Sequence, residues 1–420
     1  MTMKVAIVGG GAAGLMASAA ILESDPQAEI FLIDKNDGLG KKVIISGGGR
    51  CNVTTGIQDL KVVLTKYPRG SKFLTSAMHK FSPSDVYGWF ESHGIPLKIE
   101  NDLRVFPKSN DGHDVVKVFE KMFKASNVKL VLKNQVSGVK KVKQGFEIGL
   151  NNVETLLVDK VILTTGGQAY RQTGSTGDGY SLAASLGHTI TELAPSLSAL
   201  LTQETWPAKV AGLSFQQCSV TVFSTQLGRE GRLGRFRTSG PMLFTHKGIS
   251  GPAVFAFSSL VAFEKFDAQH PLEIAVDLMP NKTAVDLTAS LEAIKLANPK
   301  KSWINLLAEF VPKSLSEIIC QELKLDGEKR SHDISKKDLA RCVGWLKAVP
   351  LHVVSRNAGD EFVTAGGVDL KEVDPSTMQS KICPRLYFAG EILDIDGFTG
   401  GFNLQASWAT GHLAGASAAS

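Results

Sequence analysis

The feature that most constrains this chain is a glycine-rich turn close to its start. Lys4–Val8 is a short apolar run rich in β-branched residues, the pattern of a buried parallel strand. Three glycines follow it directly with the spacing G-x-G-x-x-G, namely Gly9, Gly11 and Gly14. Residues 15–22 are mostly good helix formers. Strand, turn and helix in this order predict a nucleotide-binding unit whose helix N-terminus faces phosphates.

Each glycine of this turn has its own expected role. Gly9 permits the tight turn, Gly11 lets a pyrophosphate approach the backbone, and Gly14 lets the helix pack closely on the strand. A second apolar strand, Glu29–Ile33, ends at Asp34, twenty residues after Gly14. A carboxylate at this place typically holds the ribose hydroxyls of adenosine. The complete unit favours dinucleotide binding over a coincidental glycine-rich turn, without separating NAD from FAD.

A second glycine cluster comes soon after the ribose-binding strand and extends from Ser46 to Asn52. Because glycine has no Cβ, such a segment lets the backbone contact a flat ligand directly. Ser46 and Asn52 can hydrogen-bond to that ligand, and Lys42 and Arg50 can offset phosphate charge. A flexible surface loop is the alternative, although the segment contains no Pro, Asp or Glu.

The end of the chain carries another strong signal. Leu386–Ala389 favours a strand that leads into Gly390 and Glu391, and a glycine-led segment ending in Gly400 and Gly401 opens a helix. Glu391 can accept hydrogen bonds from a ribityl chain. The helix start can aim N–H groups at the flavin N1/C2=O edge, where negative charge develops on reduction. These features favour FAD; a helix that only packs is the alternative.

Two further glycine-rich passages lie between these ends. The apolar strand 158–165 runs into Thr165, Gly166 and Gly167, and the passage 174–180 looks like a phosphate loop. No Gly-Lys-Ser/Thr follows that loop, which excludes a Walker site. The complete set of residues that we expect to bind the cofactor is Gly9, Gly11, Ala12, Ala13, Gly14, Asp34, Lys35, Lys42, Ser46, Gly47, Gly48, Arg50, Cys51, Asn52, Val136, Thr165, Gly166, Gly167, Gly390, Glu391, Gly401, Asn403 and Leu404.

With these motifs in this order, the chain resembles the BaiN/RdsA-type NAD(P)/FAD-dependent oxidoreductases, flavoproteins with a two-dinucleotide-binding-domain FAD fold. The resemblance spans essentially the whole chain and also includes the motifs 104–107, 243–252, 364–368 and 400–405. It implies that flavin N5 passes hydride to an activated C=C bond, either in a conjugated enone or in a uridine of ribosomal RNA. Asp34 and Lys247 depart from the pattern, because relatives often have Glu and an aromatic residue there.

The fold class implied by the resemblance is α/β, with a Rossmann-like FAD-binding domain split between residues 1–193 and 353–420. A small β-barrel of residues 194–280 plus about 346–352, and a helical insert subdomain at 281–345, are inserted between the two parts. The sequence pattern agrees with this division. Residues 194–280 are expected to form short strands, and residues 281–345 show helical periodicity. Only one G-x-G-x-x-G motif occurs, so we expect NAD(P)H to dock transiently as electron donor.

Two residues are candidates for chemistry. Cys51 could donate a proton, although a small group packed near the isoalloxazine is the plainer interpretation. The next cysteine is Cys218, so a local dithiol is not expected. His246 could donate a proton or hydrogen-bond a substrate carbonyl near neutral pH, and a structural histidine is the alternative. No His or Cys spacing typical of a metal site occurs, so no metal is expected.

A basic strip distinguishes residues 229–247. Five positive charges stand here against one acid, Glu230. The strip could bind the phosphates of RNA or the 2′-phosphate of NADPH, and a solvated hairpin face is the alternative. The positive residues of the strip are Arg229, Arg232, Arg235, Arg237 and Lys247.

Composition excludes several other classes. The five cysteines are odd in number and widely spaced, which argues against a disulfide framework and for a reducing compartment. No apolar run reaches the ~20 residues that cross a bilayer, and no signal-peptide pattern precedes the first strand, so we expect a cytoplasmic protein without a membrane partner. The leading function is an FAD-dependent oxidoreductase that is reduced by NAD(P)H and acts on a small molecule or on ribosomal RNA. A flavin-binding redox sensor or assembly factor, and a flavin oxidase, are alternatives.

Overall fold

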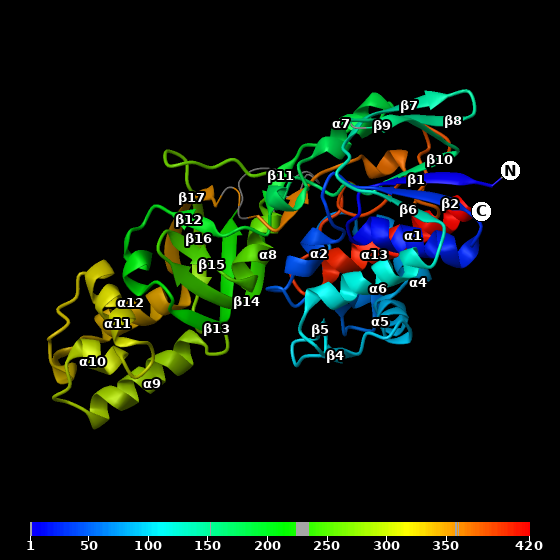
Figure 1. The fold of residues 1–420 in the computed structure, drawn as a ribbon. Helices are drawn as coiled ribbons and strands as arrows, with labels where there is room; N and C mark the ends of the chain where they lie inside the picture. Colours follow the sequence, from blue (N-terminus) through cyan, green and yellow to red (C-terminus); the bar gives the residue numbers. More distant parts are fainter. Residues whose placement is uncertain (1, 152, 224–234, 358, 360) are drawn as a thin grey trace. The chain divides into compact units, whose positions relative to one another are not determined.

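The computed structural model describes residues 2–151, 153–223, 235–357, 359 and 361–420. The chain forms two compact units (Figure 1). The first consists of Met1–Ser196 and Gly359–Ser420, and the second of Leu197–Ala358. The first unit therefore contains both ends of the chain, and the second is a continuous insertion between them.

A five-stranded sheet forms the centre of the first unit. Its order is β19-β10-β1-β2-β6, and every neighbouring pair is parallel. The strands β1, β2, β10 and β19 are almost continuous apolar runs that are largely buried, as parallel sheets require, whereas the edge strand β6 is partly exposed. Their bounds are β1 Lys4–Val8, β2 Glu29–Ile33, β6 Val128–Val131, β10 Lys160–Leu163 and β19 Leu386–Phe388.

Two helices from opposite ends of the chain pack against each other on one face of this sheet (Figure 1). They are α1, Ala12–Ser24, and α13, Phe402–Ala419. A Cβ atom added at Gly411 would lie 2.4 Å from the Ala13 carbonyl oxygen, and one at Gly415 would lie 2.4 Å from that of Ala17. Small residues on both helices thus bring the two backbones into direct contact.

Smaller elements surround the central sheet. The sheet β7-β8-β9 lies on the face opposite α1 and α13 (Figure 1). The bounds of these elements are α2 Lys41–Ile45, β3 Thr54–Thr55, α3 Leu60–Leu64, α4 Ser71–Lys80, α5 Pro83–Ser92, β4 Leu97–Ile99, β5 Arg104–Pro107, α6 Gly112–Lys124, β7 Val136–Val142, β8 Gly145–Leu150, β9 Val153–Val158, α7 Asp178–Ser185, β11 Ala194–Ser196 and β18 Val363–Ala365.

The second unit is built on a closed antiparallel barrel with the strand order β12-β15-β14-β13-β16-β17. Leu200 of β12 pairs with both Ile249 and Arg356, which joins the first and last strands and closes the barrel. The bounds are β12 Leu200–Thr202, β13 Ser214–Phe223, β14 Arg235–Thr245, β15 Gly248–Ser250, α8 Pro252–Leu260, β16 Leu272–Asp277 and β17 Val349–Arg356.

Four helices between β16 and β17 share one hydrophobic core with the barrel. Trp345 packs on Trp206 at 5.7 Å between ring centroids, and the Leu278 N–H donates to the Leu346 carbonyl at 3.0 Å. The helices are α9 Ala284–Ala297, α10 Trp303–Leu307, α11 Lys313–Glu322 and α12 Lys336–Lys347. The expected fold class, a Rossmann-like unit with an inserted barrel and a helical insert, is confirmed.

The boundaries of the parts differ in detail from the expected ones. β17 continues to Arg356 because its last residues pair with β12, so the expected division at 352/353 falls within a barrel strand. β11, expected in the barrel, pairs with β18 in the first unit.

Among the helices that the structure describes, none is long and apolar enough to span a bilayer.

The close contact of α1 and α13 gives a direct test of fold stability. Changing Gly411 to Ala places a Cβ against the Ala13 carbonyl, and we expect it to lower the free energy of unfolding by about 1–3 kcal/mol. The matched control is Gly88→Ala on α5 of the same unit, where an added Cβ has no neighbour within 4 Å. This control should be neutral or stabilising by about 0.5–1 kcal/mol. Urea denaturation of both variants provides the measurement, and equal effects would contradict the close contact.

Candidate functional site

The first glycine turn combines tight packing with one open position. Gly9 has φ +112°, and a Cβ there would lie 2.5 Å from the Thr164 carbonyl oxygen. A Cβ at Gly14 would lie 1.9 Å from the Gly9 carbonyl oxygen. At Gly11, by contrast, an added Cβ would have no neighbour within 4 Å. Gly9 and Gly14 are therefore needed for folding, whereas Gly11 borders open space at the start of α1.

The N-terminus of α1 faces this open position. Gly11 is the N-cap residue, and no side chain caps the helix. The N–H groups of the first turn, including those of Ala12 and Ala13, have no intrahelical acceptors, since the first such bond is from Leu15 to Gly11. They present the positive end of the helix dipole, which suits a phosphate.

Asp34 is fixed beside the same turn. Its Oδ2 accepts the Gly10 N–H at 2.7 Å, and its Oδ1 accepts the Asn36 N–H at 2.8 Å. Each carboxylate oxygen keeps a further lone pair for another donor. The neighbouring Lys35 forms an ion pair with Asp178 at 2.6 Å, between the Nζ and Oδ2 atoms. The backbone thus orients Asp34 for hydroxyl donors, whereas the Lys35 charge is already paired.

Glu391 lies where three distant segments of the first unit meet. Its Oε1 accepts the Thr364 N–H at 2.9 Å, and its Oε2 pairs with Lys42 Nζ at 2.7 Å. A Cβ at Gly167 would lie 2.9 Å from Glu391 Oε1, so only glycine fits between the carboxylate and the end of β10. These residues stand past the carboxyl ends of β10 and β19, the edge where parallel sheets typically bind ligands.

Thr165, directly after β10, carries an unusual hydroxyl. Its Oγ1 atom is buried and has no hydrogen-bond partner among the residues that the structure describes. A buried hydroxyl without a partner costs free energy, so such a group commonly indicates a missing ligand or water. The adjacent Gly166 has φ +73°, which turns the chain away from the strand.

The second glycine cluster forms a tight turn around Cys51. The Cys51 N–H donates to the Ser46 carbonyl at 2.9 Å, and Cys51 itself has φ +59°. Burial raises the pKa of the Cys51 thiol to about 12, although a hydrogen bond with Ser46 opposes this. The thiol therefore stays protonated near neutral pH. Added Cβ atoms at Gly48 and Gly49 would have no neighbour within 4 Å, so this backbone is open on one side.

Arg50 makes contacts that anchor the cluster to the adjoining hairpin. It forms an ion pair with Glu100, and its Nε donates to Asn110 Oδ1 at 3.0 Å. Its guanidinium carbon also lies 3.8 Å from the ring centroid of Phe106. The Arg50 charge is thus offset by a carboxylate, and the expected contact of Arg50 with phosphate stays a prediction.

The start of α13 is joined to the segment after this cluster. Gly401 has φ +90°, and a Cβ there would lie 2.3 Å from the Thr54 carbonyl oxygen. With its amide oxygen facing the Gly401 N–H at 2.8 Å, Asn52 can also donate to the carbonyls of Thr54 and Val105. One turn further on, Gln405 Oε1 accepts the Thr54 hydroxyl at 2.6 Å. Successive turns of α13 therefore bind one short N-terminal segment.

Asn403 fixes the glycine loop that precedes α13. Its side chain accepts the Gly397 N–H and donates to the Gly397 carbonyl, both at 2.8 Å. Leu404 lies beside it in the first helical turn. The N–H groups of this turn have no intrahelical acceptors, as at α1. The two helices that pack together thus each begin with an unpaired N-terminal turn.

The first unit contains all the residues expected to bind the cofactor. Val136 is one of them and begins β7 as a buried residue. Tyr180 belongs to the glycine-rich passage 174–180, but it is not among the residues expected from the sequence to bind the cofactor. Burial raises the pKa of the Tyr180 phenol, and the charges of Glu391 and Asp394 add to this effect. Thr364 is also absent from that set, although the motif 364–368 is one of those on which the resemblance rests.

The two catalytic candidates belong to different units. Cys51 lies in the first unit, and His246 is an exposed residue of the turn between β14 and β15 in the second. Of the basic strip, Arg237 donates through Nε to Ser219 Oγ at 2.6 Å, and Lys247 is exposed. Arg229 and Arg232 lie outside the described residues. The roles of His246 and of the strip stay predictions.

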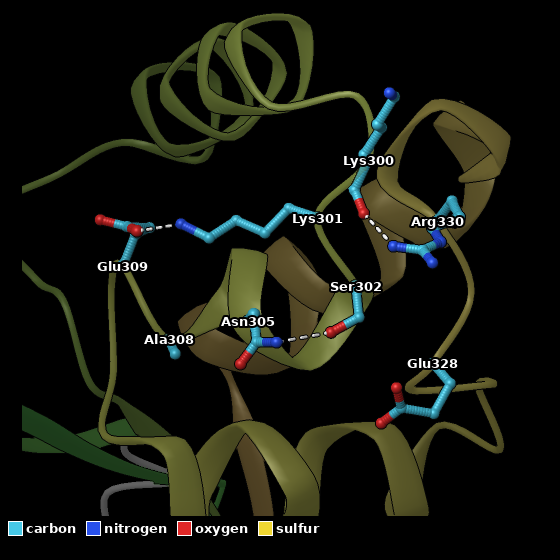
Figure 2. A pocket seen from close by; sticks show the side chains of 8 residues that line it. All are labelled: Lys300, Lys301, Ser302, Asn305, Ala308, Glu309, Glu328 and Arg330. Carbon is cyan, nitrogen blue, oxygen red and sulfur yellow. Dashed lines mark hydrogen bonds and ion pairs between the residues drawn. The ribbon is translucent and has the colours of Figure 1, made fainter.

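A polar pocket of about 680 Å³ lies among the helices of the second unit (Figure 2). Two of its polar contacts involve charged side chains. Lys301 pairs with Glu309, and Arg330 Nη1 donates to the Lys300 carbonyl at 2.6 Å. The described part of the chain contains no group of three or more His, Cys, Asp or Glu residues able to hold a metal ion.

The chain is similar over almost its whole length to a known family and to named relatives. A family model described as the HI0933-like protein Rossmann domain matches residues 3–417. The chain is 30% identical to 3-dehydro-bile acid delta(4,6)-reductase of Clostridium scindens, over 99% of both chains. It is 29% identical to ribosomal RNA dihydrouridine synthase of Escherichia coli, over 96% of this chain and 95% of that protein.

A solved structure of quinol-fumarate reductase with menaquinol matches the fold. The TM-score is 0.52 at 16% identity, and the match covers 100% of this chain and 71% of that one. At this identity the likeness concerns the fold alone. The family model, in contrast, covers almost every residue. The resemblance inferred from the motifs is therefore confirmed, and the chain belongs to the HI0933-like family of Rossmann-domain proteins.

Proposed function

We propose that this protein binds FAD and is an NAD(P)H-dependent reductase of activated C=C bonds. The observation that carries the proposal is that two uncapped helix N-termini and two oriented carboxylates belong to one unit. The helices are α1 and α13, and the carboxylates are those of Asp34 and Glu391. An elongated dinucleotide with a flavin at one end offers phosphates and hydroxyls to match these groups.

The residues present fit FAD by two independent observations. Open space borders Gly11, where a side chain would occupy the place expected for the pyrophosphate. Within the described part of the chain, the buried Thr165 hydroxyl beside the carboxyl ends of the central strands has no hydrogen-bond partner. We propose that Asp34 holds the adenosine ribose, Gly11 and Ala12 contact the pyrophosphate, and Glu391 accepts ribityl hydroxyls.

When bound, FAD would take hydride from NAD(P)H and deliver it to the electron-poor carbon of the substrate. The N–H groups of Asn403 and Leu404 would stabilise negative charge at the pyrimidine edge of the flavin. Cys51 keeps its proton because of burial, so we assign it to packing rather than to acid catalysis. His246, an exposed imidazole, is the proposed proton donor to the substrate.

The names of two relatives indicate the substrate chemistry that we propose. A bile acid delta(4,6)-reductase and an RNA dihydrouridine synthase both saturate a C=C bond, the first in a steroid and the second in a pyrimidine ring. The positive charge of the strip 229–247 favours RNA as the substrate here. A uridine would then have to leave its stack to reach the flavin, because a duplex buries the reactive bond.

The experiment that tests the reaction is anaerobic mixing of the FAD-loaded protein with NADPH or NADH. We expect loss of the yellow flavin absorbance, because the proposed reductase accepts hydride from a nicotinamide. Absence of this loss with either donor would favour the redox sensor, and steady peroxide release under air would favour the oxidase. Deleting the gene and measuring dihydrouridine in ribosomal RNA then separates the substrates, since unchanged dihydrouridine contradicts the RNA version.

The open position at Gly11 predicts a selective loss of FAD affinity. A valine there places its side chain where the pyrophosphate is expected, so we expect the dissociation constant for FAD to rise by roughly tenfold or more, about 1.4 kcal/mol. Gly88→Val is the matched control, because an added Cβ is equally free of neighbours there. Isothermal titration of both variants measures the effect. If Gly11→Val binds FAD with unchanged affinity, the proposed contact of the pyrophosphate with this turn is wrong.

The assignment of Cys51 to packing predicts an inert thiol. With its pKa raised to about 12, the thiol carries almost no thiolate at neutral pH. We therefore expect Cys51→Ala to retain the rate of flavin reduction by NADPH, and native Cys51 to resist iodoacetamide at pH 8. Stopped-flow absorbance and mass spectrometry measure the two properties. A large loss of reduction rate in a variant that still binds FAD would restore a chemical role to Cys51.

A further inference from the structure

A buried ion pair connects Arg69 to the loop that leads into α13. Arg69 forms a bidentate ion pair with Asp396, in which Nε donates to one carboxylate oxygen and Nη2 donates to the other. The Asp396 side chain is 0% exposed and that of Arg69 is 15% exposed. Ser196, the last residue of β11, adds a hydroxyl donor to the same carboxylate at 2.6 Å. Three segments far apart in sequence thus meet at one carboxylate.

The residues around Arg69 hold the rest of that loop. The Phe398 N–H donates to the Lys66 carbonyl at 2.9 Å, and the Tyr67 hydroxyl donates to the Phe402 carbonyl at 2.7 Å. A Cβ at Gly70 would lie 2.5 Å from the Ile395 side chain. The segment 66–70 therefore contacts the loop at 395, 396, 398 and 402 and fixes its path over the whole distance to the helix.

The end of this loop is the first turn of α13, which is the helix terminus that our proposed function places at the flavin. Its N–H groups act on a ligand through direction and distance, because helix-terminus effects fall off within one turn. A fully buried carboxylate that accepts hydrogen bonds from two residues, Arg69 and Ser196, fixes such a loop more firmly than exposed contacts can. The pair does not need to contact the flavin to set the position of these N–H groups.

We propose that Arg69 and Asp396 are positioning residues, whose buried ion pair with Ser196 sets where the N-terminus of α13 stands against the bound flavin. This inference rests on the proposed FAD site. It assigns no chemical step to either residue. It states that charge removal at position 396 changes the affinity and the reduction potential of the flavin, through the loop 396–402 rather than through contact.

Asp396→Asn tests this inference with readouts that do not depend on turnover. The amide has nearly the same shape, yet it cannot hold Arg69 as a charged pair, so the loop loses its buried ionic contact while its other contacts remain. We expect the dissociation constant for FAD to rise by roughly tenfold or more. We also expect the midpoint potential of the bound flavin to fall, because displaced N–H groups stabilise the reduced form less. Spectral titration and a dye-equilibration potential measurement give the two values.

A second variant separates positioning from simple stability. In Arg69→Met/Asp396→Leu no buried charge is left unpaired, so thermal stability should recover relative to Asp396→Asn. Because the apolar pair cannot direct the loop in the same way, affinity and potential should stay altered. Recovery of both flavin properties along with stability would overturn the inference and leave the ion pair a purely structural role.

Glu372→Gln is the control for general loss of packing. Glu372 accepts from His188, a side chain with 0% exposure in the same unit. We expect this variant to lose stability while keeping the flavin affinity and potential of the wild type. If wild-type protein binds no FAD, the proposed function itself fails. If wild type binds FAD and Asp396→Asn binds it equally with the same potential, only this inference fails.

Discussion

The contact between α1 and α13 is the interaction on which the first unit depends. Gly411 and Gly415 bring α13 against the backbone of Ala13 and Ala17, closer than any side chain permits. Because of this contact, two helices that begin about 390 residues apart run parallel, with both N-termini directed toward the carboxyl edge of one sheet. A chain with larger residues at these positions could form each element, but it could not join them in this way.

The same constraint explains how the candidate site is made from separate pieces. The turn at Gly11, the cluster before Asn52 and the carboxylate of Glu391 come from distant parts of the sequence. Polar contacts within the site hold these pieces: Lys42 pairs with Glu391, and Asn52 meets Gly401. The candidate site is therefore formed by segments that hydrogen bonds and ion pairs hold together. The backbone at Gly11, Gly48 and Gly49 borders open space in it.

Much of the fold and part of the site could be predicted because glycine spacing reports backbone geometry directly. The strands around Gly9 and before Gly390, and the helix after Gly401, follow from local patterns. Contacts between side chains do not. Nothing in the local sequence shows that Arg50 pairs with Glu100 or that Lys35 pairs with Asp178, because both partners are remote in sequence. For the same reason the buried Asp396 and the orphan hydroxyl of Thr165 became visible only in the folded chain.

The most direct test of the account is a crystal structure of the protein loaded with FAD. We expect one FAD per chain, with the pyrophosphate against the backbone of Gly11 and the isoalloxazine beside the first turn of α13. A flavin bound elsewhere, or a correctly folded protein that crystallises colourless from excess FAD, would contradict the claim that the two ends of the chain enclose one cofactor.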